Sequence, residues 1–298
     1  MLAYRIFVLA ITLIATITLN AQEHLIDRTT AIRNNRSVFY SVDGHTMSMT
    51  YSKHPFTIAG LKKVYADFKI SDLTRTSDPQ LPVDNYLFHG EKEVAAGLNQ
   101  YLSTYFLKNK FNRVTVMHIT GYEHRSDPYE RELVELAFLE QLPETSYQTT
   151  PLNNVQFAGR ELELGATCNW MNTNNIGCPM FGQLDWSYHE SLEGARKHSL
   201  RRYKMLEVKN RGKVVTDGRI PVIFEGESTT ARKVTYDFAG VDSPLTKESN
   251  GDLLTVYYVS ATVRGKHVSC TLSSWNKDAK DETGVAPLIS EVMQLPSR

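Results

Sequence analysis

TCNWMNTNNIGCPMFGQLDWSYHESLEGARKHSLRRY, residues 167–203, is the stretch on which the fold depends most. It holds two of the chain's three cysteines and two of its three tryptophans. Asparagine and glycine are frequent between Cys168 and Cys178, and both tolerate the left-handed backbone that turns require. The stretch therefore predicts a stapled loop, then a strand over residues 180–188, and then a helix.

The two cysteines of this loop are predicted to form a disulfide. The segment between Cys168 and Cys178 is short and rich in turn residues, so the chain can fold back and bring the two residues together. Cys270 alternates with apolar residues in a separate strand pattern and is predicted to be a buried free thiol. The spacing of Cys168, Cys178 and His189 matches no common zinc pattern, so no metal and no other cofactor is predicted.

The helix that follows is predicted from its start and its spacing. Ser187 and Glu190 fit a capping box. The apolar residues then recur at helical spacing, namely Leu192, Ala195, Leu200, Tyr203 and Leu206. The opposite face is basic, with Arg196, Lys197, Arg201 and Lys204. This face has two interpretations that stay open, a solvated helix surface or a site for an anion or a partner.

The charge balance bears on the class of partner, and the N-terminal residues indicate the cellular compartment. The chain has 298 residues and equal numbers of basic and acidic side chains, 33 of each, which gives no electrostatic case for nucleic acid. Arg5 precedes an uncharged run over residues 6–19, and Ala21 follows shortly after it, which is typical of a signal peptide cleaved after residue 21. The run is shorter than the roughly 20 residues of a membrane span. We therefore expect a secreted or periplasmic protein with no membrane span after signal removal.

The leader that ends in Asn20-Ala21-Gln22 resembles those of exported proteins of Bacteroidota. The central CNWMNTNNIGCPMFGQLDWSYHESLEGA resembles uncharacterised secreted proteins of the same group. Together the two stretches cover about 50 of the 298 residues. The resemblance implies export and the oxidising surroundings in which disulfides persist, and it implies no activity.

Hairpins and helices are both predicted along the chain. Asp43-Gly44 and Arg264-Gly265 lie between alternating apolar runs and predict two hairpins. Helices are predicted over residues 91–110, from Asp127-Pro128 to residue 142, and over residues 284–295. The fold class is therefore predicted as α+β, an antiparallel sheet built from hairpins with about four packed helices. The predicted parts are the signal peptide (1–21), an N-terminal α+β region (22–150) and a mostly-β region (151–298).

One group of polar residues lies where catalytic groups often lie, at the end of a predicted strand and the start of the next helix. The group consists of His118, His124, Asp127 and Glu130. A hydrolase could use His124 as a base that Asp127 orients. Each residue also has a structural explanation, because Asp127 and Glu130 suit the first turn of a helix.

A second polar group contains the residue types of a Ser-His-Asp arrangement, namely Asp185, Ser187, His189 and Glu190. Ser187 is already assigned as a helix cap, and the chain has no Gly-x-Ser-x-Gly elbow, Gly-rich phosphate loop or His-Glu-x-x-His motif. We therefore predict no catalytic residues. The favoured function is a non-catalytic binding protein of the cell envelope with an unidentified protein or small-molecule partner. Its predicted recognition residues are Trp170, Asn172, Asn174 and Trp186. The alternative is a secreted hydrolase that uses the His118 group.

Overall fold

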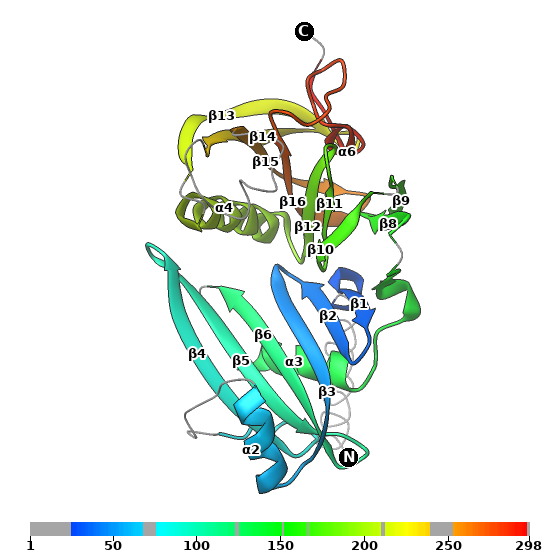
Figure 1. Cartoon of the computed structure of the whole chain (residues 1–298), viewed down its shortest axis with the longest axis vertical. Helices are drawn as coiled ribbons and strands as arrows, with labels where there is room; N and C mark the ends of the chain where they lie inside the picture. Colours follow the sequence, from blue (N-terminus) through cyan, green and yellow to red (C-terminus); the bar gives the residue numbers. More distant parts are fainter. Residues whose placement is uncertain are drawn as a thin grey trace, which may run out of the picture.

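The chain is built mainly from β-strands, as shown by a computed structural model that describes residues 25–67, 76–122, 125–150, 152–165, 167–209, 212–238 and 253–296. The strands form a seven-stranded sheet, an eight-stranded sheet and a two-stranded ribbon. The two large sheets occupy opposite ends of the molecule, and helix α4 (Leu192–Lys209) lies between them (Figure 1). In the described part of the chain, no helix is long and apolar enough to cross a membrane.

The predicted α+β class with about four packed helices is wrong, because strands dominate the described residues. The main cause is the segment 91–110, which was predicted as a helix and is a hairpin of β4 and β5. The apolar residues of this segment fit a helical spacing by coincidence. In β5, successive side chains point to opposite faces of the sheet, and apolar residues occur on both faces. Gly97, which a helix interior would disfavour, has φ +68° and forms the hairpin turn.

The seven-stranded sheet has the order β4-β5-β6-β3-β2-β1-β7, and only the β1–β7 pair is parallel. Its strands are β1 (Thr30–Asn34), β2 (Ser37–Val42), β3 (His45–Pro55), β4 (Asn85–Ala95), β5 (Leu98–Lys108), β6 (Arg113–Tyr122) and β7 (Tyr147–Gln148). Helix α3 (Asp127–Phe138) packs Leu133 and Leu136 against one face of this sheet. Helix α2 (Ile58–Asp67) packs Leu61 and Val64 against the other face. A short 3-10 helix, Glu144–Ser146, leads into β7.

The eight-stranded sheet is antiparallel, with the order β10-β11-β12-β16-β15-β14-β13-β17. Its strands are β10 (Asn169–Asn172), β11 (Asn175–Cys178), β12 (Gly182–His189), β13 (Lys213–Phe224), β14 (Glu227–Asp237), β15 (Leu253–Val263), β16 (Lys266–Trp275) and β17 (Met293–Gln294). One face packs against the ribbon of β8 (Asn154–Phe157) and β9 (Arg160–Glu163) and against the short helix α6 (Pro287–Ser290). Trp186 is 2% exposed in this core.

Helix α4 covers the other face of the eight-stranded sheet and also contacts the seven-stranded sheet. Tyr203 and Leu206 pack onto the cluster around Tyr258. From a different side of the helix, Met205 packs against Leu98 of the β4–β5 hairpin. The helix therefore links the two sheets and has one side toward each.

The contact between the two sheets is close at the β2–β3 turn. Asp43 and Gly44 have φ +48° and +75°, as the predicted hairpin requires. The Cα of Gly44 faces the ring of His198, and a Cβ built on Gly44 would lie 2.1 Å from its Nδ1. Nearby, Thr30 donates a hydrogen bond of 2.7 Å from Oγ1 to Asn174 Oδ1. Glycine at position 44 therefore permits the β2–β3 turn to approach His198 of α4, and a residue with a Cβ would block this approach.

Several local predictions are confirmed and others are wrong. Both hairpins and the helix from Asp127 are present. The helix predicted over residues 284–295 is reduced to α6, followed by β17. The capping box at Ser187 and Glu190 is wrong, because β12 continues through Ser187 and pairs with β16. Ser191 acts as the cap instead, and its Oγ accepts a hydrogen bond of 3.1 Å from the amide of Gly194.

Candidate functional site

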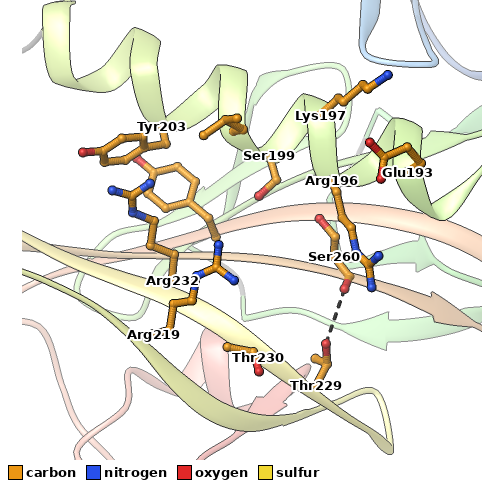
Figure 2. A pocket seen from close by; sticks show the side chains of 12 residues that line it. Glu193, Arg196, Lys197, Ser199, Tyr203, Arg219, Thr229, Thr230, Arg232 and Ser260 are labelled. Atoms are coloured by element: carbon orange, nitrogen blue, oxygen red, sulfur yellow. Dashed lines mark hydrogen bonds between the residues drawn. The ribbon is translucent and has the colours of Figure 1, made fainter.

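A pocket of about 580 Å³ lies between helix α4 and strands β13, β14 and β15. This volume is in the range of small-molecule sites. The residues that line it are Glu193, Arg196, Lys197, Ser199, Leu200, Tyr203, Arg219, Thr229, Thr230, Arg232, Tyr258 and Ser260. Figure 2 shows Arg196 reaching down from the helix toward the sheet, and Arg219 and Arg232 rising from the strands toward Tyr203. Positive side chains thus enter the pocket from both walls.

The strand wall places two arginines side by side. Arg219 of β13 and Arg232 of β14 are direct cross-strand partners on the face that α4 covers. Like charges in directly opposite positions destabilise a sheet. Asp217 neutralises one of them, since its carboxylate accepts hydrogen bonds of 2.8 and 2.6 Å from Arg232. The same contact lowers the pKa of Asp217. Within the described residues Arg219 has no ion-pair partner.

The β13–β14 turn sets the arginine pairing, since the register runs without a break from Phe224 and Glu227 through Arg219 and Arg232 to Thr216 and Thr235, and a bulge follows only there. The register shifts between Val214 and Thr216, so that Val215 is an extra residue opposite β14. Because of the shift, Val214 and Asp217 share one face of the strand although they are three residues apart. Beyond the bulge, Asp217 and Arg219 alternate regularly toward the pocket.

The helix wall adds further positive charge. Arg196 and Lys197 are exposed at the pocket, and neither has an ion-pair partner among the described residues. Glu193 is the acidic residue that lines the pocket. Four basic side chains and one acidic side chain therefore face the space directly, and among the described residues only Arg232 of the four is held in an ion pair. Such a lining favours an anion.

The inner end of the pocket is aromatic. The guanidinium of Arg232 lies 3.5 Å from the centroid of the Tyr203 ring, and the Tyr203 and Tyr258 rings meet edge to face. Tyr258 is buried, and its hydroxyl lies 3.5 Å from that of Tyr236. Burial, reinforced by this neighbour, raises the pKa of Tyr258, so its hydroxyl stays protonated and can donate a hydrogen bond. The pocket therefore offers a flat apolar surface beside its cationic groups.

Hydroxyl groups complete the lining at the other end. Ser260 donates a hydrogen bond of 3.2 Å to the backbone carbonyl of Ala195, which ties β15 to the first turns of α4. Thr229 donates to the carbonyl of Ser260 at 3.5 Å, as Figure 2 marks. Ser199 and Thr230 also face the pocket. These groups can accept or donate hydrogen bonds to a polar ligand, but no arrangement of nucleophile and base occurs among them.

The candidate residues of the alternative hydrolase lie elsewhere, and of these Asp127 and Glu130 share a partner, Arg125. His118 bonds Thr104 through Nδ1 at 2.9 Å. Asp127 is exposed and pairs with Arg125 at 2.6 Å, and Arg125 also lies 3.4 Å from Glu130. His124 lies outside the described residues. The hydrolase alternative, which depends on His124, stays a prediction.

Glu130 is fully buried and belongs to a hydrogen-bond network. Its carboxylate accepts bonds of 2.6 Å from Ser103 and 3.0 Å from Tyr105. Ser103 also bonds His89, which lies 2.7 Å from Arg125. Burial is the main cause that raises the pKa of Glu130. The side chain that was a catalytic candidate is thus positioned to hold α3 on the sheet.

The predicted recognition residues are partly interior. Trp186 is in the core, and the ring of Trp170 packs 6.3 Å from it, while Trp170 Nε1 donates to the Thr149 carbonyl. Asn174 is buried and bonds Thr30, whereas Asn172 is exposed. Trp186 and Asn174 therefore stabilise the fold from inside. Recognition at Trp170 and Asn172 stays a prediction.

The second polar group was Asp185, Ser187, His189 and Glu190, and the structure brings only part of it together. Ser187 and His189 share a hydrogen bond of 2.8 Å, and both are buried. Asp185 instead pairs with Arg202 of α4 at 2.6 Å and accepts from Asn175. A buried serine and histidine whose acid is held elsewhere do not form a triad. No group of three or more His, Cys, Asp or Glu side chains in the described residues is arranged to hold a metal ion.

The Cys168–Cys178 disulfide is confirmed, and Cys270 is free and buried, as predicted. Burial raises the pKa of the Cys270 thiol. The disulfide closes a hairpin of β10 and β11 rather than an irregular loop. We expect Cys168→Ser to lower the free energy of unfolding by about 2–3 kcal/mol, since the link restricts the unfolded chain. Urea titration of this variant and of reduced wild-type protein should give the same loss, and an unchanged midpoint would show that the link adds no stability.

The comparisons with known proteins leave the chain without an assigned family. No model of a known protein family matches it, and no curated protein matches it. One similar solved structure is StfQ, a di-domain ARO/CYC protein of the steffimycin biosynthetic pathway (10% identity, 82% of this chain and 72% of that chain, TM-score 0.16). Another is DynU16, a protein of the dynemicin biosynthetic locus (7% identity, 82% and 74%, TM-score 0.17). TM-scores this low support neither a shared fold nor a shared function.

Proposed function

We propose that this chain is a non-catalytic binding protein of the cell envelope, and that its ligand is a small organic anion held between α4 and strands β13 to β15. One observation carries the proposal, the direct pairing of Arg219 with Arg232 on the pocket wall opposite Arg196. The carboxylate of Asp217 pairs with Arg232 and not with Arg219, and an anion that bridges the two guanidinium groups would stabilise them.

The chemistry of the walls limits the ligand. Guanidinium groups recognise carboxylate and phosphate oxygens with two parallel hydrogen bonds. The Tyr203 and Tyr258 rings and the apolar part of Leu200 suit a ligand with a flat or apolar body. The hydroxyl groups at the other end suit a polar substituent. A phosphorylated or carboxylated molecule with an aromatic or sugar-like body meets these three demands.

The location is part of the same proposal. The leader pattern over residues 1–21 supports export, and the Cys168–Cys178 disulfide is compatible with an oxidising compartment. The basic face that was predicted on the helix also takes part, because Arg196 and Lys197 from that face line the pocket. Of its two open interpretations, the pocket favours the anion site.

Arg219→Gln is expected to weaken the binding of an organic phosphate about tenfold or more, because a charge-assisted pair is lost while the side chain keeps most of its length. Isothermal titration calorimetry with pyridoxal phosphate, glucose 6-phosphate, 4-hydroxybenzoate and inorganic pyrophosphate as probes would measure this. Arg196→Gln should give a similar loss. Arg36→Gln, in the exposed turn between β1 and β2, is the matched control and should leave affinity unchanged.

The proposal requires specific results from these titrations. At least one probe must bind the wild-type protein, and its affinity must fall with added salt because the contacts are ionic. Binding that Arg219→Gln and Arg196→Gln leave intact would place the ligand elsewhere. If none of the probes binds, the proposal that this pocket takes small organic anions of these classes fails.

A further inference from the structure

Helix α2 lies at the end of the seven-stranded sheet farthest from α4 (Figure 1), and apolar and basic residues are exposed there. Phe111, in the turn between β5 and β6, is 71% exposed, and Ile58, the first residue of α2, is 62% exposed. Exposed large apolar side chains that cluster often mark a surface that binds a protein or a membrane. We call this region the α2 tip and define it as residues 53–63 together with residues 108–113.

The two segments of the α2 tip are held against each other by backbone contacts. The amide of Phe56 donates a hydrogen bond of 2.9 Å to the carbonyl of Asn112. Pro55 pairs with Arg113 across β3 and β6. The turn that carries Phe111 therefore lies beside the start of α2, and the two exposed apolar side chains belong to one surface. Gly60 supports this packing, because a Cβ there would lie 2.1 Å from the Pro55 carbonyl oxygen.

The charged residues of the α2 tip itself are all basic. Six basic side chains of the α2 tip are exposed, and the five apart from Lys108 are Lys53, Lys62, Lys63, Lys110 and Arg113. Within the described residues none of the five has an ion-pair partner. Lys108 is different, because Asp84 pairs with it at 2.9 Å. Lys110 Nζ lies 5.5 Å from the centroid of the Phe111 ring, so the ammonium group is a neighbour of the exposed apolar side chain.

Helix α2 arranges these features on one side. Its buried residues are Gly60, Leu61, Val64 and Tyr65, which pack onto the sheet. Ile58 and Lys62 are four residues apart and therefore share the outward side of the helix. A short helix with an apolar side chain and lysines on its outer side, beside an exposed phenylalanine, has the chemistry of a peripheral membrane contact.

We infer that the α2 tip docks on an anionic lipid surface, with Phe111 and Ile58 inserted at the level of the headgroups and the surrounding lysines on lipid phosphates. Charge complementarity is the reason to prefer this occupant. A surface of five unpaired cations opposes a second copy of itself, whereas anionic headgroups attract it, and the apolar side chains at its centre gain from leaving water. This inference is independent of the ligand pocket, which lies on the other side of α4 and shares no residue with the tip.

Vesicle co-sedimentation tests the inference. The protein should sediment with vesicles of phosphatidylglycerol and phosphatidylcholine, bind vesicles of phosphatidylcholine much more weakly, and dissociate from the former in high salt. Lys62→Gln combined with Lys63→Gln should weaken partitioning roughly 25-fold, since each basic residue contributes about 1 kcal/mol. Phe111→Ser should weaken it roughly tenfold.

Matched controls separate binding through the α2 tip from non-specific binding to vesicles. Lys92→Gln with Lys213→Gln removes two exposed lysines elsewhere, and Phe181→Ser removes an exposed phenylalanine of the other sheet. Both controls should bind as the wild type does. Equal binding to the two kinds of vesicle, no binding to either, or equal losses in the tip variants and the controls would overturn the inference. Unchanged circular dichroism of each variant ensures that a loss reflects the surface and not the fold.

Discussion

Glu130→Ala is expected to lower the free energy of unfolding by about 3–5 kcal/mol, a large share of the stability of an ordinary domain. The carboxylate is fully buried and accepts hydrogen bonds from Ser103 and Tyr105. Removal leaves two buried hydroxyls without their acceptor and leaves Arg125 without one of its two carboxylates. Urea unfolding followed by tryptophan fluorescence and circular dichroism would measure the loss.

Two control variants make this prediction specific. Asp127→Ala removes the exposed carboxylate that also pairs with Arg125, and it should cost less than about 1 kcal/mol because the pair is solvated. Glu130→Gln keeps one acceptor oxygen and should cost less than Glu130→Ala. If Glu130→Ala proves as stable as the wild type, the buried network does not hold α3 on the sheet. The question of a catalytic role for Glu130 would then reopen.

The second large effect is expected on acidification, because three histidines are enclosed where the two sheets meet. His198 and His189 are buried, with ring centroids 5.0 Å apart, and His45 bonds the Tyr101 hydroxyl at 2.9 Å. Burial lowers the pKa of His189 to about 4 and that of His198 well below its usual value. Burial also lowers the pKa of His45.

The sign of the effect follows from proton uptake. In the unfolded chain a histidine binds its proton below about pH 6.5, whereas folded His189 stays neutral until about pH 4. Between these values the unfolded state holds more protons, so stability falls as the pH falls. His189 alone accounts for about 3 kcal/mol across this window. Glu130 and Asp185 oppose the effect, because burial raises the pKa of both carboxyls, so between the raised and the ordinary pKa the folded state takes up their protons first.

The charged surroundings of the histidines strengthen the expectation. Arg201 and Arg28 lower the pKa of His189, and His45 lowers it as well. Asp43 raises it, but this carboxylate already accepts two hydrogen bonds from Arg28 and one from Tyr129. Other charged or titratable groups at the junction are Arg202, Glu190 and Tyr101. A protonated His189 would therefore compete with Arg28 and Tyr129 for the Asp43 carboxylate.

Urea unfolding at pH 7 and at pH 4.5 measures the expected loss. His189→Gln should reduce the difference between the two pH values by about 2–3 kcal/mol, since the side chain keeps a polar group for Ser187 and no longer titrates. His54→Gln, on β3 at the far end of the seven-stranded sheet, should leave the difference unchanged. Equal stability of the wild type at both pH values would show that the buried histidines do not control the response to acid.

Local turn chemistry explains why parts of the fold could be predicted from the sequence. Asp43-Gly44 and Arg264-Gly265 have positive φ at both residues, which few other pairs tolerate, so these hairpins are encoded by neighbours in the chain. The proline after Asp127 similarly marks the start of α3. The segment 91–110 was misread because one set of apolar positions fits both periods over a short window. The partners that decide between the periods are in β6, and these are not local.

The pocket could be predicted only on its helix side. Arg196 and Lys197 stand in an evident basic stripe, and the sequence left an anion site open there. Arg219 and Arg232 are 13 residues apart on two strands, and their pairing depends on the hairpin register. That register runs from the β13–β14 turn to Thr216 and Thr235, where the bulge at Val215 begins. The charge pair that defines the site is thus a property of strand pairing.

The same bulge has a consequence for how the molecule behaves in a crowded compartment. β17 covers β13 only at Ile223 and Phe224, so much of the outer edge of β13 has no neighbouring strand in the described part of the chain. An open, flat edge invites further strands from other molecules and leads to aggregation. The irregular backbone at Val215 and the missing amide hydrogen of Pro221 make this edge a poor template. The strand that carries Arg219 is thus also protected from edge-to-edge association.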